Sequence, residues 1–248
     1  MSRVVAGIQP VREAIRALGN RVEKLLVLHR PDHRSPTLDA LSRFARDQGI
    51  PVEPAPDSTL DRLAPRAMHQ GAVALVPDLR LIPLDALVRS DASLVIALDR
   101  IVDPHNFGAV VRSSVAFGAQ AVMWPENSSA PLSQAMFRAS AGAVEHASLC
   151  RVRSLPEALL ELRQNGRRVV GLAGDGPDLL PHIDLTSPVV VVVGSEGEGL
   201  RKGVRNACDS IARIPTLPPV SVLNASVSAA VALYEVRRQR LAAQPPSP

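Results

Sequence analysis

The sequence predicts an α/β fold whose larger part is a mostly parallel sheet, and three observations support this prediction. From residue 93 onward, short apolar runs alternate with stretches of helical periodicity. One run, residues 189–193, consists of five consecutive valines, which is typical of a strand covered on both faces. The order strand, helix, strand is typical of parallel sheets with helices on both sides. With 248 residues, of which 46% are hydrophobic, the chain can bury a sizeable core.

The first 77 residues predict a small α/β domain. Apolar residues recur there with helical spacing in two segments, and two short apolar runs, one between these segments and one after them, are typical of strands. Gly49 and Pro51 end the second helical segment. The predicted elements are a helix at 11–18, a strand at 24–28, a helix at 38–48 and a strand at 71–76.

Residues 78–92 predict a linker, because they have two nearby prolines, scattered charges and no clear period. A short helix at 84–88 is the alternative for part of this segment. Residues 93–248 then form the predicted larger domain. Its expected strands are 94–98, 121–124, 168–172 and 189–193, and its expected helices are 108–117, 155–164 and 227–241.

The composition excludes several classes of protein. Two cysteines without a CxxC pair support neither a disulfide scaffold nor a cysteine-based zinc site, and the six histidines form no HExxH motif, so we expect no metal. No apolar run approaches the ~20 residues that span a bilayer, so we expect a soluble cytoplasmic protein without a membrane partner. The aromatic content of 2% argues against nucleic-acid binding by base stacking, which leaves phosphate and shape contacts.

The first chemistry-bearing motif follows the predicted strand 94–98. Asn106 is a candidate helix cap, Gly108 allows close approach of another backbone, and Arg112 projects about one and a half turns further along the helix. A purely structural interpretation is that Asp103 and Pro104 form a turn and Arg112 makes a surface salt bridge.

The second motif follows the valine strand and reads Gly-Ser-Glu-Gly-Glu-Gly at 194–199. It is neither the dinucleotide fingerprint GxGxxG nor a P-loop. Glu196 and Glu198 would repel the phosphates of a nucleotide, whereas a cationic ligand such as S-adenosylmethionine meets no such penalty. The alternative is an ordinary turn capped by Ser195 or Glu196.

The third motif is the proline-broken segment 214–230, which enters a helix rich in small residues. These small side chains allow close packing against another backbone or a flat ligand. Helix capping by Ser221 or Asn224 is the alternative interpretation.

In their order and spacing, the three motifs resemble those of the SpoU-type RNA 2′-O-ribose methyltransferases. The resemblance covers residues 93–241. It extends to Gly7–Ile15 and His69–Gly71, which look like the N-terminal substrate-binding domain of that family. Among its members, the chain is most similar to the bacterial enzymes that methylate a guanosine 2′-hydroxyl of 23S rRNA.

The resemblance implies a C-terminal parallel α/β domain with a trefoil knot, an exception to the rule against knots, and a small L30e/L7Ae-like N-terminal domain. It implies S-adenosylmethionine as cofactor, RNA, in particular 23S rRNA, as substrate, and a homodimer with the site near its interface. Motif by motif, it identifies Gly194, Ile214 and Leu223 as cofactor contacts. It identifies as reaction-site residues Asn106, Arg112, Glu196 and Asn224.

The resemblance also implies roles for these reaction-site residues. Because a guanidinium stays protonated in proteins, we expect Arg112 to stabilise the developing alkoxide and to align a phosphate, rather than to act as a base. Glu196 is expected to orient Arg112 or backbone donors of its loop, and Asn224 to bind the ribose. Phosphate contacts are expected from Arg12, Arg16, Arg66 and Arg138.

One residue departs from the family pattern, which reads Ser-Leu-Asn in the third motif. The serine position is Val222 here, so Ser221 or Ser226 supplies the hydroxyl or turnover is impaired. Val222 favours one alternative to the guanosine enzyme, a non-catalytic RNA-binding or ribosome-assembly homologue. A second alternative is an antibiotic-resistance methyltransferase of the same family, with the same chemistry at another nucleotide.

Overall fold

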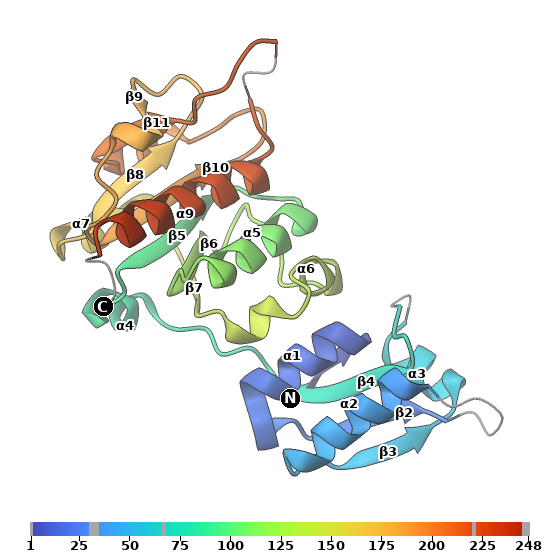
Figure 1. The fold of residues 1–248 in the computed structure, drawn as a ribbon. Coiled ribbons are helices and arrows are strands. Elements are labelled where there is room, and N and C mark those ends of the chain that lie inside the picture. Colours follow the sequence, from blue (N-terminus) through green and yellow to red (C-terminus); the bar gives the residue numbers. More distant parts are fainter. Residues whose placement is uncertain (1, 30–34, 66–67, 220–221, 245–248) are drawn as a thin grey trace. The chain divides into compact units, whose positions relative to one another are not determined.

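In a computed structural model, the chain divides into two compact units (Figure 1). The structure describes residues 2–29, 35–65, 68–219 and 222–244. Unit 1 comprises Met1–Leu79 together with Ala141–His146. Unit 2 comprises Arg80–Ser140 and Ala147–Pro248.

Unit 1 is built on a four-stranded mixed sheet with the strand order β1-β4-β2-β3. Strand β4 runs antiparallel to both β1 and β2, whereas β2 and β3 are parallel. The strands are β1 (Ser2–Ala6), β2 (Lys24–Leu28), β3 (Val52–Ala55) and β4 (Ala72–Pro77). The helices are α1 (Ile8–Leu18), the 3-10 turn η1 (Gly19–Arg21), α2 (Pro36–Asp47), α3 (Asp57–Leu63) and the 3-10 turn η2 (Ala143–His146).

Alternation along β4 explains how unit 1 forms two apolar layers. Ala72, Ala74 and Val76 pack into a core with α1 and α2, while Val73 packs on the opposite face with α3. Successive residues of a strand point to opposite faces, so one short strand serves both cores.

Unit 2 contains a seven-stranded sheet in the order β7-β6-β5-β10-β8-β11-β9, and every neighbouring pair is parallel. The predicted α/β fold with a parallel sheet is thereby confirmed. The central strand β10 pairs with β5 and β8 on its two sides and is completely buried. The strands are β5 (Leu94–Asp99), β6 (Ala121–Pro125), β7 (Leu149–Val152), β8 (Arg168–Leu172), β9 (Asp178–Leu179), β10 (Val189–Gly194) and β11 (Ser210–Arg213).

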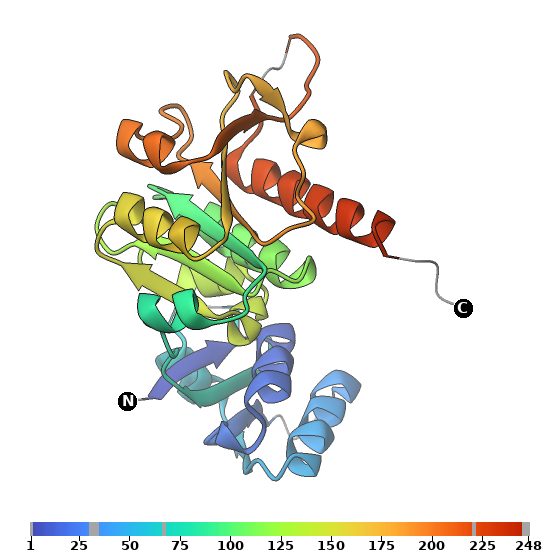
Figure 2. The ribbon, with the colours of Figure 1, turned by 90° about the vertical axis from the view of Figure 1, so that its left-hand side faces the viewer.

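Helices cover both faces of this sheet, as Figure 2 shows along the sheet edge. Val190 and Val192 of β10 share a core with α4, α7 and α8. The intervening valines point to the other face, where α5, α6 and α9 lie. The helices are α4 (Leu84–Arg89), α5 (Pro104–Ala116), α6 (Gln134–Ala139), α7 (Leu155–Gln164), the 3-10 turn η3 (Leu180–His182), α8 (Lys202–Ala207) and α9 (Ala225–Ala242).

The segment expected as a linker contains helix α4 and packs within unit 2. Leu87 is 1% exposed. The buried guanidinium of Arg167 donates hydrogen bonds to four carbonyl oxygens of this segment, at Leu87, Val88, Ser90 and Ala92, over 2.6–3.2 Å. These bonds hold the backbone of 87–92 against the start of β8.

Helix α5 begins four residues earlier than the sequence predicts, and the interpretation of Asn106 as its cap is wrong. Asp103 is the N-cap, and its carboxylate accepts a hydrogen bond from the backbone N–H of His105 at 2.9 Å. Pro104 occupies the first turn, where its fixed φ favours helix and its missing N–H costs nothing. Asn106 therefore lies inside the first turn and is 9% exposed.

Gly108 is needed for packing of helices. A Cβ at this position would lie 2.4 Å from the carbonyl oxygen of Met136 and 2.6 Å from the Cβ of Ala139. The close approach expected from the sequence is thus the approach of α5 to α6.

Candidate active site

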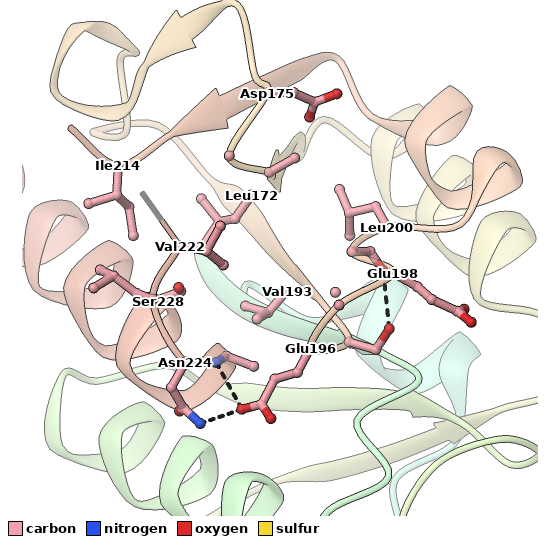
Figure 3. A pocket seen from close by; sticks show the side chains of 18 of the residues that line it. Leu172, Asp175, Val193, Glu196, Glu198, Leu200, Ile214, Val222, Asn224 and Ser228 are labelled. Atoms are coloured by element: carbon pink, nitrogen blue, oxygen red, sulfur yellow. Dashed lines mark hydrogen bonds between the residues drawn. The ribbon is translucent and has the colours of Figure 1, made fainter. Parts of the chain in front are cut away.

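A cavity of about 740 Å³ lies at the carboxyl ends of β8, β10 and β11 (Figure 3). Ligands of open parallel sheets bind at such strand ends, where loops and helix starts expose backbone groups. The walls come from the segment after β8, the glycine loop after β10, the end of β11 and the start of α9. The lining residues fall in the ranges 172–175, 193–200, 222–225 and the positions Arg205, Ala212, Ile214, Thr216 and Ser228.

The glycine loop, residues 194–200, folds back on the end of its own strand. The backbone N–H of Gly199 donates to the carbonyl oxygen of Ser195 at 3.0 Å. A Cβ on Gly194 would lie 2.3 Å from the carbonyl carbon of Gly199, so no side chain fits there. Gly197 and Gly199 have φ values of +87° and +65°, which glycine adopts without strain. The glycines of this motif therefore serve the tight shape of the loop.

Three polar side chains from three separate elements meet at the tip of this loop. Oε1 of Glu196 accepts a hydrogen bond from Nδ2 of Asn106 at 2.8 Å and a second one from Nδ2 of Asn224. Nδ2 of Asn224 also approaches Oδ1 of Asn106 at 3.1 Å. Figure 3 shows the Glu196 side chain directed at Asn224. This cluster connects the loop to α5 and α9.

The orientation of Asn224 is set by helix capping. Its Oδ1 accepts hydrogen bonds from the backbone N–H groups of Ser226, at 2.9 Å, and Val227, at 3.3 Å. Because the oxygen faces the helix, the amide nitrogen faces Glu196. The sequence left helix capping and a role in the site as alternatives for Asn224. The structure shows that the same side chain does both, with its oxygen capping the helix and its nitrogen bonded to Glu196.

The structure brings most of the expected site residues together. The three expected cofactor contacts, Gly194, Ile214 and Leu223, all line the cavity, as do Glu196 and Asn224. Asn106 joins them through its bond to Glu196.

Arg112 is the expected reaction-site residue that the chain does not bring to this cluster. It is exposed and makes no hydrogen bond or ion pair with any residue that the structure describes. Six residues after Asn106, it lies about 240° further around the helix, so the two side chains point in different directions. Glu196 accordingly orients Asn106 and Asn224 and has no contact with Arg112.

An ion pair in the cavity wall was missed by the sequence analysis. The guanidinium of Arg205 donates to Oδ1 of Asp175 at 3.0 Å, and this hydrogen bond lowers the pKa of Asp175 below its usual value. Both residues line the cavity. The sequence feature that could have indicated this pair is the Gly-Asp-Gly segment at 174–176. It follows β8 just as the first and second motifs follow β5 and β10.

Val222 also lines the cavity and is 71% exposed. Of the two expected substitutes for the family serine, Ser221 lies outside the described residues. The hydroxyl of Ser226 donates to Oδ1 of Asn224 at 2.6 Å and is thus engaged in the helix cap. Ser228, two residues further along the helix, lines the cavity, and its hydroxyl has no hydrogen-bond partner among the residues described.

The side chains of the described residues indicate neither metal nor thiol chemistry. No group of three or more His, Cys, Asp or Glu side chains is placed to hold a metal ion within the described ranges. Burial raises the pKa of Cys150 to about 11 and that of Cys208 to about 12, so neither thiol is a nucleophile near neutral pH. In the same ranges, every helix is too short or too polar to cross a bilayer.

The arginines expected to contact RNA differ in their exposure and partners. Arg16 of α1 is exposed and pairs with Glu13 at 2.8 Å, and Arg138 is exposed on α6. Arg12 is half-buried, and Arg66 lies outside the described residues.

The parallel sheet and the cavity at its carboxyl ends define an α/β protein with a site for a ligand of nucleotide size. Two family models match the chain: the SpoU rRNA Methylase family over residues 93–234, and RNA 2′-O ribose methyltransferase substrate binding over residues 4–81. The chain belongs to the SpoU family of RNA methyltransferases, as the sequence predicts.

Relatives of known sequence and structure agree with this assignment. A protein of Mycolicibacterium vanbaalenii named an uncharacterized tRNA/rRNA methyltransferase is 40% identical over 98% of this chain and 78% of its own length. The AdoMet-bound rRNA methyltransferase of Sinorhizobium meliloti is 25% identical, with a TM-score of 0.77 over 96% of this chain and 87% of its own. The SpoU methyltransferase AviRb of Streptomyces viridochromogenes in complex with AdoMet is 26% identical, with a TM-score of 0.78 over 97% and 91%.

Proposed function

We propose that this protein transfers a methyl group from S-adenosylmethionine (AdoMet) to a ribose 2′-hydroxyl of structured RNA, with a guanosine of 23S rRNA as the substrate. The observation that carries the proposal is the Asn106–Glu196–Asn224 cluster at the rim of a cavity of suitable size. The match of residues 4–81 to an RNA 2′-O ribose methyltransferase substrate-binding model supports the 2′-hydroxyl as acceptor.

The residues of the cavity fit AdoMet in size and charge. A volume of about 740 Å³ lies within the range of ~300–1,000 Å³ usual for such ligands. Ile214, Leu223 and Val222 provide an apolar wall for a flat base, and the backbone of the glycine loop is accessible because its glycines carry no side chain. The carboxylate of Glu196, which has no cationic partner among the described residues, favours a cationic ligand. When bound, AdoMet supplies an activated methyl group on a positive sulfur.

The polar cluster has the geometry of a positioning device. Only Oε1 of Glu196 accepts hydrogen bonds from described residues, which leaves Oε2 to accept one from the ribose 2′-hydroxyl. The amides of Asn106 and Asn224 hold this carboxylate in place, so Oε2 is presented to the hydroxyl in one orientation. Placing the nucleophile in line with the methyl group supplies much of the acceleration in a transfer reaction.

Arg112 enters this proposal as a residue supplied by a second copy of the chain. Helix α9 presents Val227, Tyr234 and Leu241 at seven-residue spacing, and these side chains are 46%, 55% and 50% exposed. Such an apolar stripe is typical of a helix that packs against a partner. A homodimer formed there buries the stripe and brings Arg112 of one protomer toward the cluster of the other, where its guanidinium stabilises developing negative charge.

The proposal assigns RNA recognition to the N-terminal domain, residues 1–77, and chemistry to residues 93–248, which form the trefoil knot expected from the family. Ribosomal RNA matures in the bacterial cytoplasm, so this substrate implies a cytoplasmic enzyme. Contacts to RNA phosphates make binding weaker as the salt concentration rises.

Mapping ribose methylation tests the proposal. RNA from cells with and without the gene is hydrolysed in alkali, which does not cleave next to a 2′-O-methylated ribose. We expect one 23S rRNA guanosine to lose its protection when the gene is deleted, and the purified protein with AdoMet to restore it. Protection restored at another nucleotide contradicts the substrate, and no protection anywhere contradicts the 2′-hydroxyl as acceptor.

A further inference from the structure

Asp99, the last residue of β5, is a buried carboxylate that the reaction-site cluster does not use. Its exposure is 0%, and it faces Gly194 in the register of β5 and β10. Its Oδ1 accepts a hydrogen bond from Nε of Arg201 at 2.7 Å, and its Oδ2 accepts one from the backbone N–H of Arg201 at 2.8 Å. Burying an ionised carboxylate costs free energy unless it is paired and hydrogen-bonded. Both oxygens of Asp99 are bonded to Arg201, and these two bonds fix the position of Arg201 relative to β5.

Arg100, the next residue, binds the same loop at another point. Its Nη1 lies 2.6 Å from Oε2 of Glu198, and the two side chains are 35% and 68% exposed. The backbone of Arg100 has φ +61°, a region that residues other than glycine adopt only under some strain. The strained conformation directs consecutive side chains at two different positions of one loop.

The loop is therefore attached at three points. Its tip is bonded through Glu196 to α5 and α9, while Glu198 on its returning limb and Arg201, which directly follows the loop, are bonded to the end of β5. Gly197 and Gly199 lie between these attachments, and within the loop the backbone bond from Gly199 to Ser195 is a further restraint. Without the attachments of the returning limb, a chain segment so rich in glycine has many alternative conformations.

We infer that Asp99 and Arg100 are positioning residues for the glycine loop: through Arg201 and Glu198 they hold the cofactor-facing backbone and the carboxylate of Glu196 in place. This inference rests on the proposed function, since it concerns the same cavity. It assigns to the end of β5 the task of organising a loop that follows β10. Asp99 has the larger effect because its bonds are buried, whereas the Arg100–Glu198 pair is exposed and weaker.

AdoMet binding to purified variants, measured by calorimetry together with the melting temperature, tests the Asp99 contact. We expect D99N and R201Q to raise the Kd for AdoMet about ten-fold, the effect typical of losing a hydrogen bond to a charged group. R163Q is the matched control, because it breaks another Arg–Asp pair, Arg163–Asp209 at 2.6 Å, outside the cavity lining. Where D99N fails to fold, R201Q decides, since the Arg201 side chain is 37% exposed.

The Arg100 contact permits a test that separates positioning from stability. R100G removes the strained φ together with the ion pair, so we expect the melting temperature to change by less than about 2 °C while the Kd for AdoMet rises about three-fold. The charge exchange R100E/E198R restores the pair and the affinity.

These measurements distinguish failure of the inference from failure of the proposed function. An unchanged chain that binds no AdoMet contradicts the function itself. An unchanged chain that binds AdoMet, combined with D99N, R201Q and R100G variants of unaltered Kd, overturns only the positioning role. A rise in Kd for R163Q equal to that for R201Q overturns it as well.

Discussion

Helix α5 carries two of the expected reaction-site residues, and the chain treats them in opposite ways. Asn106, in the first turn, is 9% exposed and bonded to Glu196. Arg112, a turn and a half later, is exposed and has no polar partner in the described part of the chain. Two residues of one motif thus differ in whether the chain itself provides them with a polar partner. Asn106 is positioned by the fold of a single chain, whereas we propose that Arg112 acts on the cluster of a second copy.

This difference separates what the fold prepares in advance from what assembly adds. The Asn106–Glu196–Asn224 cluster is formed without a ligand. The conformational entropy lost in ordering its side chains is therefore lost on folding and not on substrate binding. In the proposed function, Arg112 gains its polar partner only when a second copy of the chain brings it to the cluster. We therefore expect a second copy of the chain to restore activity to an Arg112 variant, by supplying the missing side chain to the other protomer.

The largest expected effect is that of E196Q. The substitution keeps the shape of the side chain and removes the charge that both asparagine amides bind. Because hydrogen bonds to a charged group are worth ~1.5–3 kcal/mol each, we expect kcat/KM for RNA methylation to fall about 100-fold or more. Transfer of a radiolabelled methyl group to RNA measures it. E198Q, on the same loop, is the control and retains kcat/KM within about ten-fold. An E196Q variant as active as E198Q contradicts the role of the cluster.

Mixing two inactive variants sharpens the comparison. We expect R112A and E196Q each to be inactive as homodimers, and a mixture refolded together to regain about a quarter of the normal activity. Half of the dimers are then mixed, and one of the two sites in each mixed dimer has both residues. A mixture as inactive as its components contradicts supply of Arg112 by a second copy. R112K, which keeps the charge but loses the planar fork, is expected to be about ten-fold less active.

Substitution of Arg167 is expected to lower the stability of the fold without changing AdoMet binding. The R167M variant loses the hydrogen bonds to four carbonyl oxygens of 87–92 and leaves these acceptors unsatisfied in a buried place. We expect the free energy of unfolding in urea to fall by about 3 kcal/mol, with an unchanged Kd for AdoMet. R151M, an exposed arginine on β7, is the control and changes it by less than about 0.5 kcal/mol. Loss of AdoMet binding by folded R167M contradicts this separation.

The smallest expected effect concerns Val222. Because the hydroxyl of Ser228 already lies in the cavity wall, V222S is expected to change the Kd for AdoMet by less than about three-fold. In the S228A background the same substitution recovers affinity lost with the Ser228 hydroxyl. A ten-fold gain in V222S alone contradicts this account and identifies Val222 as a defect of the site.

The sequence predicted the parallel sheet and most of the cavity, because long apolar runs and glycine-rich motifs are local signals. The valine run became the buried β10, and Gly194, Ile214 and Leu223 line one cavity. Short elements such as β3, β7 and β11 gave too few residues for a period to be seen.

Relations between distant residues were harder to predict. That Glu196 bonds to Asn106 rather than to Arg112 depends on where α5 begins, and hence on Asp103 and Pro104. The pairing of Asp99 with Arg201, 102 residues apart, follows only from the register of β5 and β10. No local pattern contains either contact.

Calorimetric titration of the purified chain with AdoMet, with and without RNA, tests the central claim most directly. We expect one AdoMet to bind per chain without RNA, because the cavity and the cluster are already formed by a single fold. If the unchanged chain takes up no AdoMet under either condition, the assignment of this cavity as the cofactor site is contradicted.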